Sequence, residues 1–104
     1  MKKITYLIFI AIFFSCESSR EVEEVNLYSQ RHYAVDELQY ENFTKLTGIE
    51  VNVTKANADE LIQRLKNEGD KTEADLFITV DVGKLWQAGN MGLLQKINSD
   101  IINP

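Results

Sequence analysis

The chain contains one cysteine, Cys16, so no disulfide can form within it. Its 104 residues carry 11 basic and 16 acidic side chains, a formal net charge of −5, which argues against nucleic-acid binding. Neither the Gly-x-Gly-x-x-Gly nor the Gly-x4-Gly-Lys-Ser/Thr pattern occurs, which argues against a dinucleotide or nucleotide site. No nucleophile stands at a suggestive spacing from a base, so the sequence does not predict an enzyme.

The one long hydrophobic run lies at the amino terminus. Two lysines precede an almost unbroken apolar stretch at residues 4–14. Because spanning a bilayer takes roughly 20 apolar residues, we expect residues 1–15 to form a cleaved signal peptide rather than a membrane helix. Ser15 and Cys16 at its end resemble the bacterial lipobox, in which the cysteine becomes the lipid-modified first residue. The sequence thus predicts lipidation of Cys16, and ordinary cleavage that leaves a free thiol is the alternative.

The rest of the chain divides into a short polar segment and a folded part. Residues 16–24 are polar and show no apolar period, so we expect a tether behind a lipid anchor. Such an anchor would hold the protein at the bacterial cell envelope, on the periplasmic side or on the outer face of a membrane. Residues 25–104 then form the folded part, which is long enough for one small domain at most.

Strand and helix patterns alternate along this folded part. Alternating or continuous apolar runs predict strands, and apolar residues at helical spacing follow each run. The expected strands cover residues 25–28, 49–54 and 74–80, and the expected helices cover about residues 34–47, 58–68 and 82–89. This βαβαβα order is typical of an α/β fold with a parallel sheet and right-handed crossovers. In the last helix Trp86 shares a face with Val82 and Leu85, so we expect it in the core.

Three loops follow the carboxyl ends of the expected strands, the edge at which open α/β sheets bind ligands. They cover residues 29–33, 55–57 and 79–81. The first loop contains Arg31, His32 and Tyr33, two metal-capable side chains beside a cation. Taken alone, a histidine next to a tyrosine is usually structural or merely exposed. In the third loop, Asp81 is a candidate helix N-cap.

Three segments carry a family resemblance. They are residues 27–33 (Leu-Tyr-Ser-Gln-Arg-His-Tyr), residues 41–49 (Glu-Asn-Phe-Thr-Lys-Leu-Thr-Gly-Ile), and residues 74–81 (Ala-Asp-Leu-Phe-Ile-Thr-Val-Asp) with Leu85 and Trp86. Together they resemble the amino-terminal lobe of ferric-iron-binding proteins of ABC importers, which are type II periplasmic binding proteins. The resemblance implies a receptor that closes two lobes around one ferric ion, Fe3+, and delivers it to the membrane permease subunits. This chain would form only a partial amino-terminal lobe, and the full-length form would be a monomer.

The resemblance also implies a ligand set. In the family subgroup that uses histidine and tyrosine, the first loop binds the metal, which assigns this role to His32 and Tyr33. The remaining ligands in the family are tyrosines of the second lobe. Some members have a glutamate ligand where this chain has Val80, which cannot bind metal. Arg31 could stabilise Tyr33 as a phenolate or neutralise an anion on the metal. Asp81 could support the site indirectly, with helix capping as the competing role.

Ferric ion prefers anionic oxygen ligands and tolerates imidazole, so tyrosine must lose its proton to bind it, and binding should weaken as the pH falls. Two other functions stay open. One is a receptor of the same fold for an oxyanion or another metal, because helix N-termini on the rim can hold anions. The other is a truncated lipoprotein without transport activity. We expect the mature chain by itself to be marginally stable, because its sheet leaves an uncovered edge. We also expect it to bind iron weakly, because two ligands leave most of the coordination sphere to water.

Overall fold

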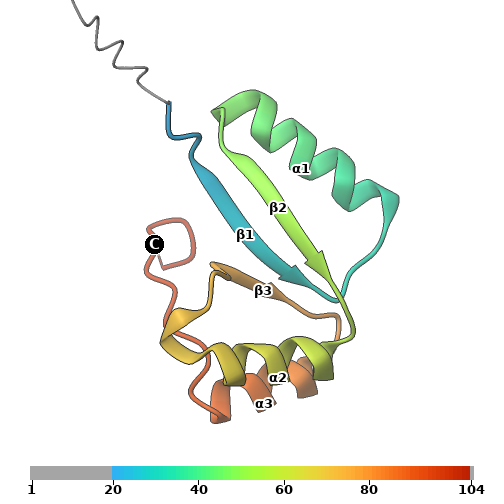
Figure 1. Cartoon of the computed structure of the whole chain (residues 1–104), viewed down its shortest axis with the longest axis vertical. Helices are drawn as coiled ribbons and strands as arrows, with labels where there is room; N and C mark the ends of the chain where they lie inside the picture. The colour runs from blue at the N-terminus through green and yellow to red at the C-terminus, as the bar shows by residue number, and fades with distance from the viewer. Residues whose placement is uncertain (1–19, 104) are drawn as a thin grey trace, which may run out of the picture.

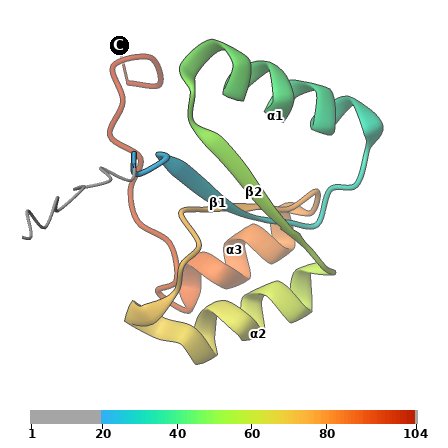
Figure 2. The same ribbon diagram turned by 45° about the horizontal axis from the view of Figure 1, so that its top comes forward.

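In the computed structural model, which describes residues 20–103, three parallel strands form a sheet with helices on both faces (Figures 1 and 2). In chain order the elements are β1 (Glu24–Ser29), α1 (Ala34–Thr47), β2 (Glu50–Lys55), α2 (Ala58–Glu68), the 3₁₀ turn η1 (Gly69–Lys71), β3 (Leu76–Ile78) and α3 (Val82–Asn90). The predicted α/β class and βαβαβα order are confirmed. The predicted signal peptide, residues 1–15, and the predicted lipidation site, Cys16, lie outside the described residues.

Strand β1 lies in the centre of the sheet, in the spatial order β2-β1-β3. The chain first steps from β1 to β2 on one side, and then passes back beyond β1 to β3 on the other side. Right-handed crossovers in opposite directions require helices on opposite faces. Figure 2 shows this arrangement, with α1 on one face of the sheet and α2 and α3 on the other. Because all three strands run the same way, the loops that follow them meet at one edge.

Capping signals in the sequence define the helix ends. Gly48 follows the last residue of α1 as its C-cap, and its φ of 76° lies in the left-handed region that favours glycine. Asn57 begins α2 by accepting a hydrogen bond from the backbone N–H of Glu60 at 3.0 Å. Strand β3 is shorter than the predicted residues 74–80. Beyond its carboxyl end, the N–H of Val80 donates to the side chain of Gln30 at 3.3 Å instead of continuing the strand ladder. Within residues 20–103, no helix is both long enough and apolar enough to span a membrane.

The hydrophobic core lies between the sheet and α2. It is formed by Tyr28, Leu61 and Leu65, and partly buried apolar residues pack around it: Ala56, Ala74, Phe77 and Leu93. Among the helices of the described part of the chain, α2 buries the largest apolar stripe, and its Leu61 is only 1% exposed.

The prediction that Trp86 lies in the core is wrong. Its side chain is 70% exposed, and Val82 on the same helix is 82% exposed. Helix α3 buries only Ala88, and among the helices and strands it contacts α2 alone. Helical spacing shows that side chains share a face, but burial also requires a second element over that face, and none of the described elements covers Trp86.

A polar network joins β1 to the end of α2. The hydroxyl of Tyr28 donates to Glu68, at 3.0 Å from Oε1 and 2.9 Å from Oε2. Arg64 Nε at 2.6 Å and Thr72 Oγ1 at 2.7 Å donate to the same carboxylate. Burial, reinforced by the Glu68 carboxylate, raises the pKa of Tyr28. The bonds from Arg64 and Thr72 hold the pKa of Glu68 below its usual range.

Tyr28→Phe is expected to lower the free energy of unfolding by about 1.5 kcal/mol, because a buried hydroxyl loses its bond to a charged acceptor. The network needs Glu68 ionised and Tyr28 protonated. Because the pKa of Glu68 is lowered by folding, its contribution to stability is present above about pH 4.3 and is lost as the pH falls further. Because the pKa of Tyr28 is raised by folding, its contribution is present below about pH 10 and is lost above it. Urea unfolding of both proteins across pH should show a constant difference at neutral pH that shrinks at both extremes. A difference that stays constant down to about pH 3 would contradict the role of Glu68.

Candidate metal site

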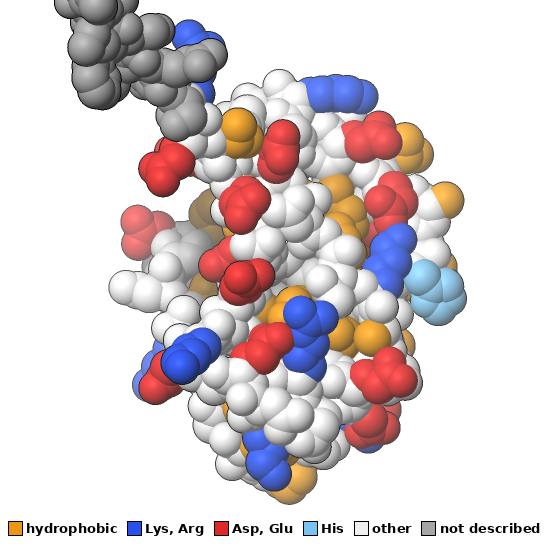
Figure 3. All heavy atoms as spheres, viewed as in Figure 1, with side chains coloured by type: hydrophobic (Ala, Val, Ile, Leu, Met, Phe, Trp, Pro, Cys, Tyr) orange, Lys and Arg blue, Asp and Glu red, His pale blue; other side chains and the backbone are white. Residues whose placement is uncertain are grey.

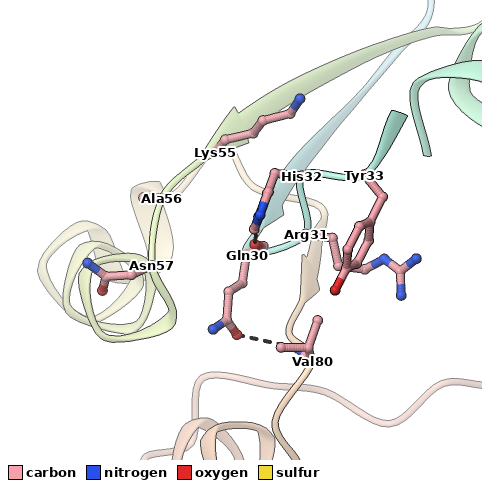
Figure 4. Close-up of a pocket in the computed structure, with 8 residues that line it drawn as sticks. All are labelled: Gln30, Arg31, His32, Tyr33, Lys55, Ala56, Asn57 and Val80. Carbon is pink, nitrogen blue, oxygen red and sulfur yellow. Dashed lines mark hydrogen bonds between the residues drawn. The ribbon is translucent and has the colours of Figure 1, made fainter. Parts of the chain in front are cut away.

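The three rim loops enclose a depression of about 370 Å³ at the carboxyl edge of the sheet (Figure 4). It is lined by Gln30, Arg31, His32 and Tyr33 after β1, by Lys55, Ala56 and Asn57 at the end of β2 and in the next loop, and by Val80 after β3. The parallel strands thus bring together segments that are up to 50 positions apart in the sequence, as in the contact between Gln30 and Val80. This is the edge at which the sequence predicted a ligand.

His32 and Tyr33 project from the loop side by side (Figure 4). Their rings are stacked with centroids 5.5 Å apart and planes inclined by 19°, and both side chains are exposed, Tyr33 by 52%. Tyr33 is the N-cap residue of α1, and its carbonyl oxygen accepts from the N–H of Asp36 at 3.0 Å. The start of α1 therefore fixes the backbone from which Tyr33 extends.

The orientation of His32 leaves one ring nitrogen available. Its Nδ1 lies 3.4 Å from the carbonyl oxygen of Gln30, a long hydrogen bond in the tautomer that carries the proton on Nδ1. In that tautomer Nε2 presents its lone pair, the arrangement that metal-binding histidines use. His32 could thus supply a neutral nitrogen ligand, and Tyr33 an anionic oxygen ligand, from one loop.

Arg31 is held beside Tyr33 by Asp36. Its Nε and Nη2 donate to the two carboxylate oxygens at 3.0 and 2.8 Å, and its guanidinium carbon lies 5.1 Å from the centroid of the Tyr33 ring. The bonds from Arg31 hold the pKa of Asp36 below its usual range, and Asp36 in turn raises the pKa of Arg31. The salt bridge to Asp36 therefore holds the Arg31 cation over the face of the Tyr33 ring.

The structure separates Asp81 from the rest of the predicted site. Its carboxylate accepts from the N–H of Gly83 at 2.7 Å, which caps the start of α3, and it is not among the residues that line the depression. The capping role therefore has direct structural support. Val80 does line the depression but offers no ligand atom.

On this rim, the loop after β1 contributes the only histidine and the only tyrosine that line the depression. Within residues 20–103, no three His, Cys, Asp or Glu side chains gather closely enough to hold a metal. Lys55 also lines the depression and forms an ion pair with Glu37 of α1. The face shown in Figure 3 carries scattered acidic side chains with basic ones between them, and its histidine lies exposed at the edge. Gln30 also lines the depression, and its place directly after β1 is the sequence signal that puts it on the rim.

The fold and its rim define a partial lobe of an α/β binding protein with a metal-capable loop. The chain is 46% identical over 82 residues to iron uptake protein A1 of Synechocystis sp. The aligned residues cover 79% of this chain and 23% of the relative. Its structure resembles that of a Trichodesmium protein in complex with iron and citrate, with a TM-score of 0.73, 49% identity, and coverage of 77% of this chain and 25% of that one. The ferric binding protein of Campylobacter jejuni gives a TM-score of 0.71 at 47% identity, covering 73% and 24%.

These relatives confirm the predicted resemblance: the chain is similar in sequence and structure to part of proteins named for iron uptake or ferric binding. It spans about a quarter of the length of the curated relatives that it matches. No protein-family model matches the chain.

Proposed function

We propose that this chain is part of a ferric-iron receptor in which His32 and Tyr33 bind the metal. The observation that carries the proposal is the stacked His32–Tyr33 pair, exposed at the sheet edge where parallel α/β folds bind ligands. The relatives support the choice of metal, since the Trichodesmium protein was solved with iron and citrate.

The rest of the receptor follows as part of the same proposal. Residues 1–15 are a signal peptide, Cys16 carries a lipid anchor, residues 16–24 form the tether, and residues 25–104 form a partial amino-terminal lobe. The receptor works at the cell envelope, closes a second lobe over the iron, and delivers the ion to permease subunits of an ABC importer. It acts as a binding protein rather than an enzyme, which fits relatives named for iron uptake and ferric binding.

The chemistry of the pair matches a ferric ion. Fe3+ is a hard acceptor that binds phenolate strongly and accepts imidazole, which are the two ligand types that Tyr33 and His32 offer. Two ligands from one loop leave most of the coordination positions to water or to other groups. We therefore expect weak binding by the 104-residue chain alone.

The test is a ligand comparison on the purified chain. Ferric ion supplied as its nitrilotriacetate complex should produce a visible tyrosinate-to-iron absorbance band, and ferric ion should raise the melting temperature more than Zn2+, sulfate or phosphate at equal concentration. Stabilisation by an oxyanion without any ferric band would overturn the ferric assignment and favour an oxyanion receptor of the same fold, because helix N-termini on this rim can hold anions.

A further inference from the structure

Gln30 fastens the metal-capable loop to the loop after β3. Its carboxamide oxygen accepts from the hydroxyl of Thr79 at 2.7 Å and from the N–H of Val80 at 3.3 Å. Its backbone N–H donates to the carbonyl oxygen of Ile78 at 2.9 Å. Gln30 thus bonds to three consecutive residues, Ile78, Thr79 and Val80, where β3 ends and the next loop begins.

The bonding partners fix the direction of the Gln30 carboxamide. A backbone N–H only donates, so the end that faces Val80 must be the oxygen, and the amide nitrogen points away from Val80 (Figure 4). The Thr79 hydroxyl accepts from the N–H of Asp81 at 3.3 Å and gives its single proton to Gln30. Each of these three hydrogen bonds therefore pairs one donor with one acceptor.

Gln30 directly precedes the three residues Arg31, His32 and Tyr33 of the metal-capable loop. His32 and Tyr33 are exposed, so packing does little to place them, and the backbone of their loop decides where their rings lie. Gln30 begins that loop, and its carbonyl oxygen is the partner of His32 Nδ1. If the two carboxamide bonds were lost, Gln30 would keep one hydrogen bond to this side of the sheet, from its backbone N–H to the carbonyl oxygen of Ile78.

We infer that Gln30 is a positioning residue of the ferric site: together with Thr79 it holds the loop in the conformation that presents His32 and Tyr33 to one ion. This inference rests on the proposed function. The general reason is entropic, because a loop that must be ordered on binding lowers affinity by the cost of ordering it, whereas a tethered loop has already met that cost.

The test compares two tether variants with a matched control. Gln30→Met and Thr79→Val each remove the bond between these side chains at nearly constant size. Gln63→Met makes the same change on α2, which lies away from the rim. There the Gln63 carboxamide nitrogen donates to the side-chain oxygen of Asn67 at 3.0 Å. Each tether variant should weaken ferric binding about tenfold relative to Gln63→Met. The double variant should lose little more, because both substitutions remove the same bond between Gln30 and Thr79. Thr79→Ser keeps the hydroxyl and should recover most of the loss.

Amide relaxation by NMR in the metal-free chain adds a readout that does not depend on iron. Gln30→Met should increase the mobility of the His32 and Tyr33 amides and leave α2 unchanged. If the wild-type chain binds iron but the tether variants match Gln63→Met, the inference fails and the proposed function stands. If the wild-type chain gives no ferric band, the proposed function fails, and unchanged relaxation at His32 and Tyr33 would then overturn the tether as well.

Discussion

The combined substitution of His32 by alanine and Tyr33 by phenylalanine is expected to abolish the visible tyrosinate-to-iron band and to lower ferric affinity at least about a hundredfold. Loss even of a group that orients a metal ligand typically costs about 10–100-fold, and this variant removes both ligands that the loop offers. The cationic side chains of Arg31 and Lys55 would remain at the depression and repel Fe3+. Ferric titration followed by absorbance measures both effects at once.

The single variants separate the roles of the two ligands. Tyr33→Phe should remove the band, while His32→Ala should keep a weakened band because the phenolate remains. Tyr40→Phe is the matched control, since it makes the same change on α1 at a residue that does not line the depression. Because His32 and Tyr33 are exposed, neither single variant should change the unfolding free energy by more than about 0.5 kcal/mol. A band that persists in Tyr33→Phe at full strength would show that this residue is not the ligand.

Leu61→Ala is expected to lower the free energy of unfolding by about 3 kcal/mol and leave much of the chain unfolded at 25 °C. Leu61 is 1% exposed and contributes to the core with Tyr28 and Leu65, so truncation removes buried apolar surface and leaves a cavity. A domain of this size has little stability to lose. Urea unfolding followed by circular dichroism measures the change.

Leu46→Ala provides the comparison for this core variant. It is the same chemical change on α1, where Leu46 is 86% exposed, so we expect a cost below about 0.5 kcal/mol. The predicted location of the core would be wrong if Leu61→Ala proved no more destabilising than Leu46→Ala.

The sequence by itself determined the order of the elements and most of their ends. Helix α2 covers Ala58–Glu68, the residues predicted from its apolar spacing, because that spacing, the N-cap at Asn57 and the glycine that follows are local signals. The same local patterns placed His32 and Tyr33 in a loop after a strand. A parallel sheet then requires that loop to lie on the ligand-binding edge. The proposal that the metal is ferric iron rests on family resemblance and not on these local patterns.

Only the tertiary structure decided which surfaces are covered and which distant residues meet. Trp86 shares a helical face with other apolar residues, yet it stays 70% exposed because no described element packs over that face. The bond between Gln30 and Thr79 joins residues 49 positions apart, and nothing in either local pattern predicts it. Periodicity reports the direction of a side chain relative to its own helix or strand. What that side chain meets depends on the sheet order β2-β1-β3, which brings the loops after β1 and β3 into contact.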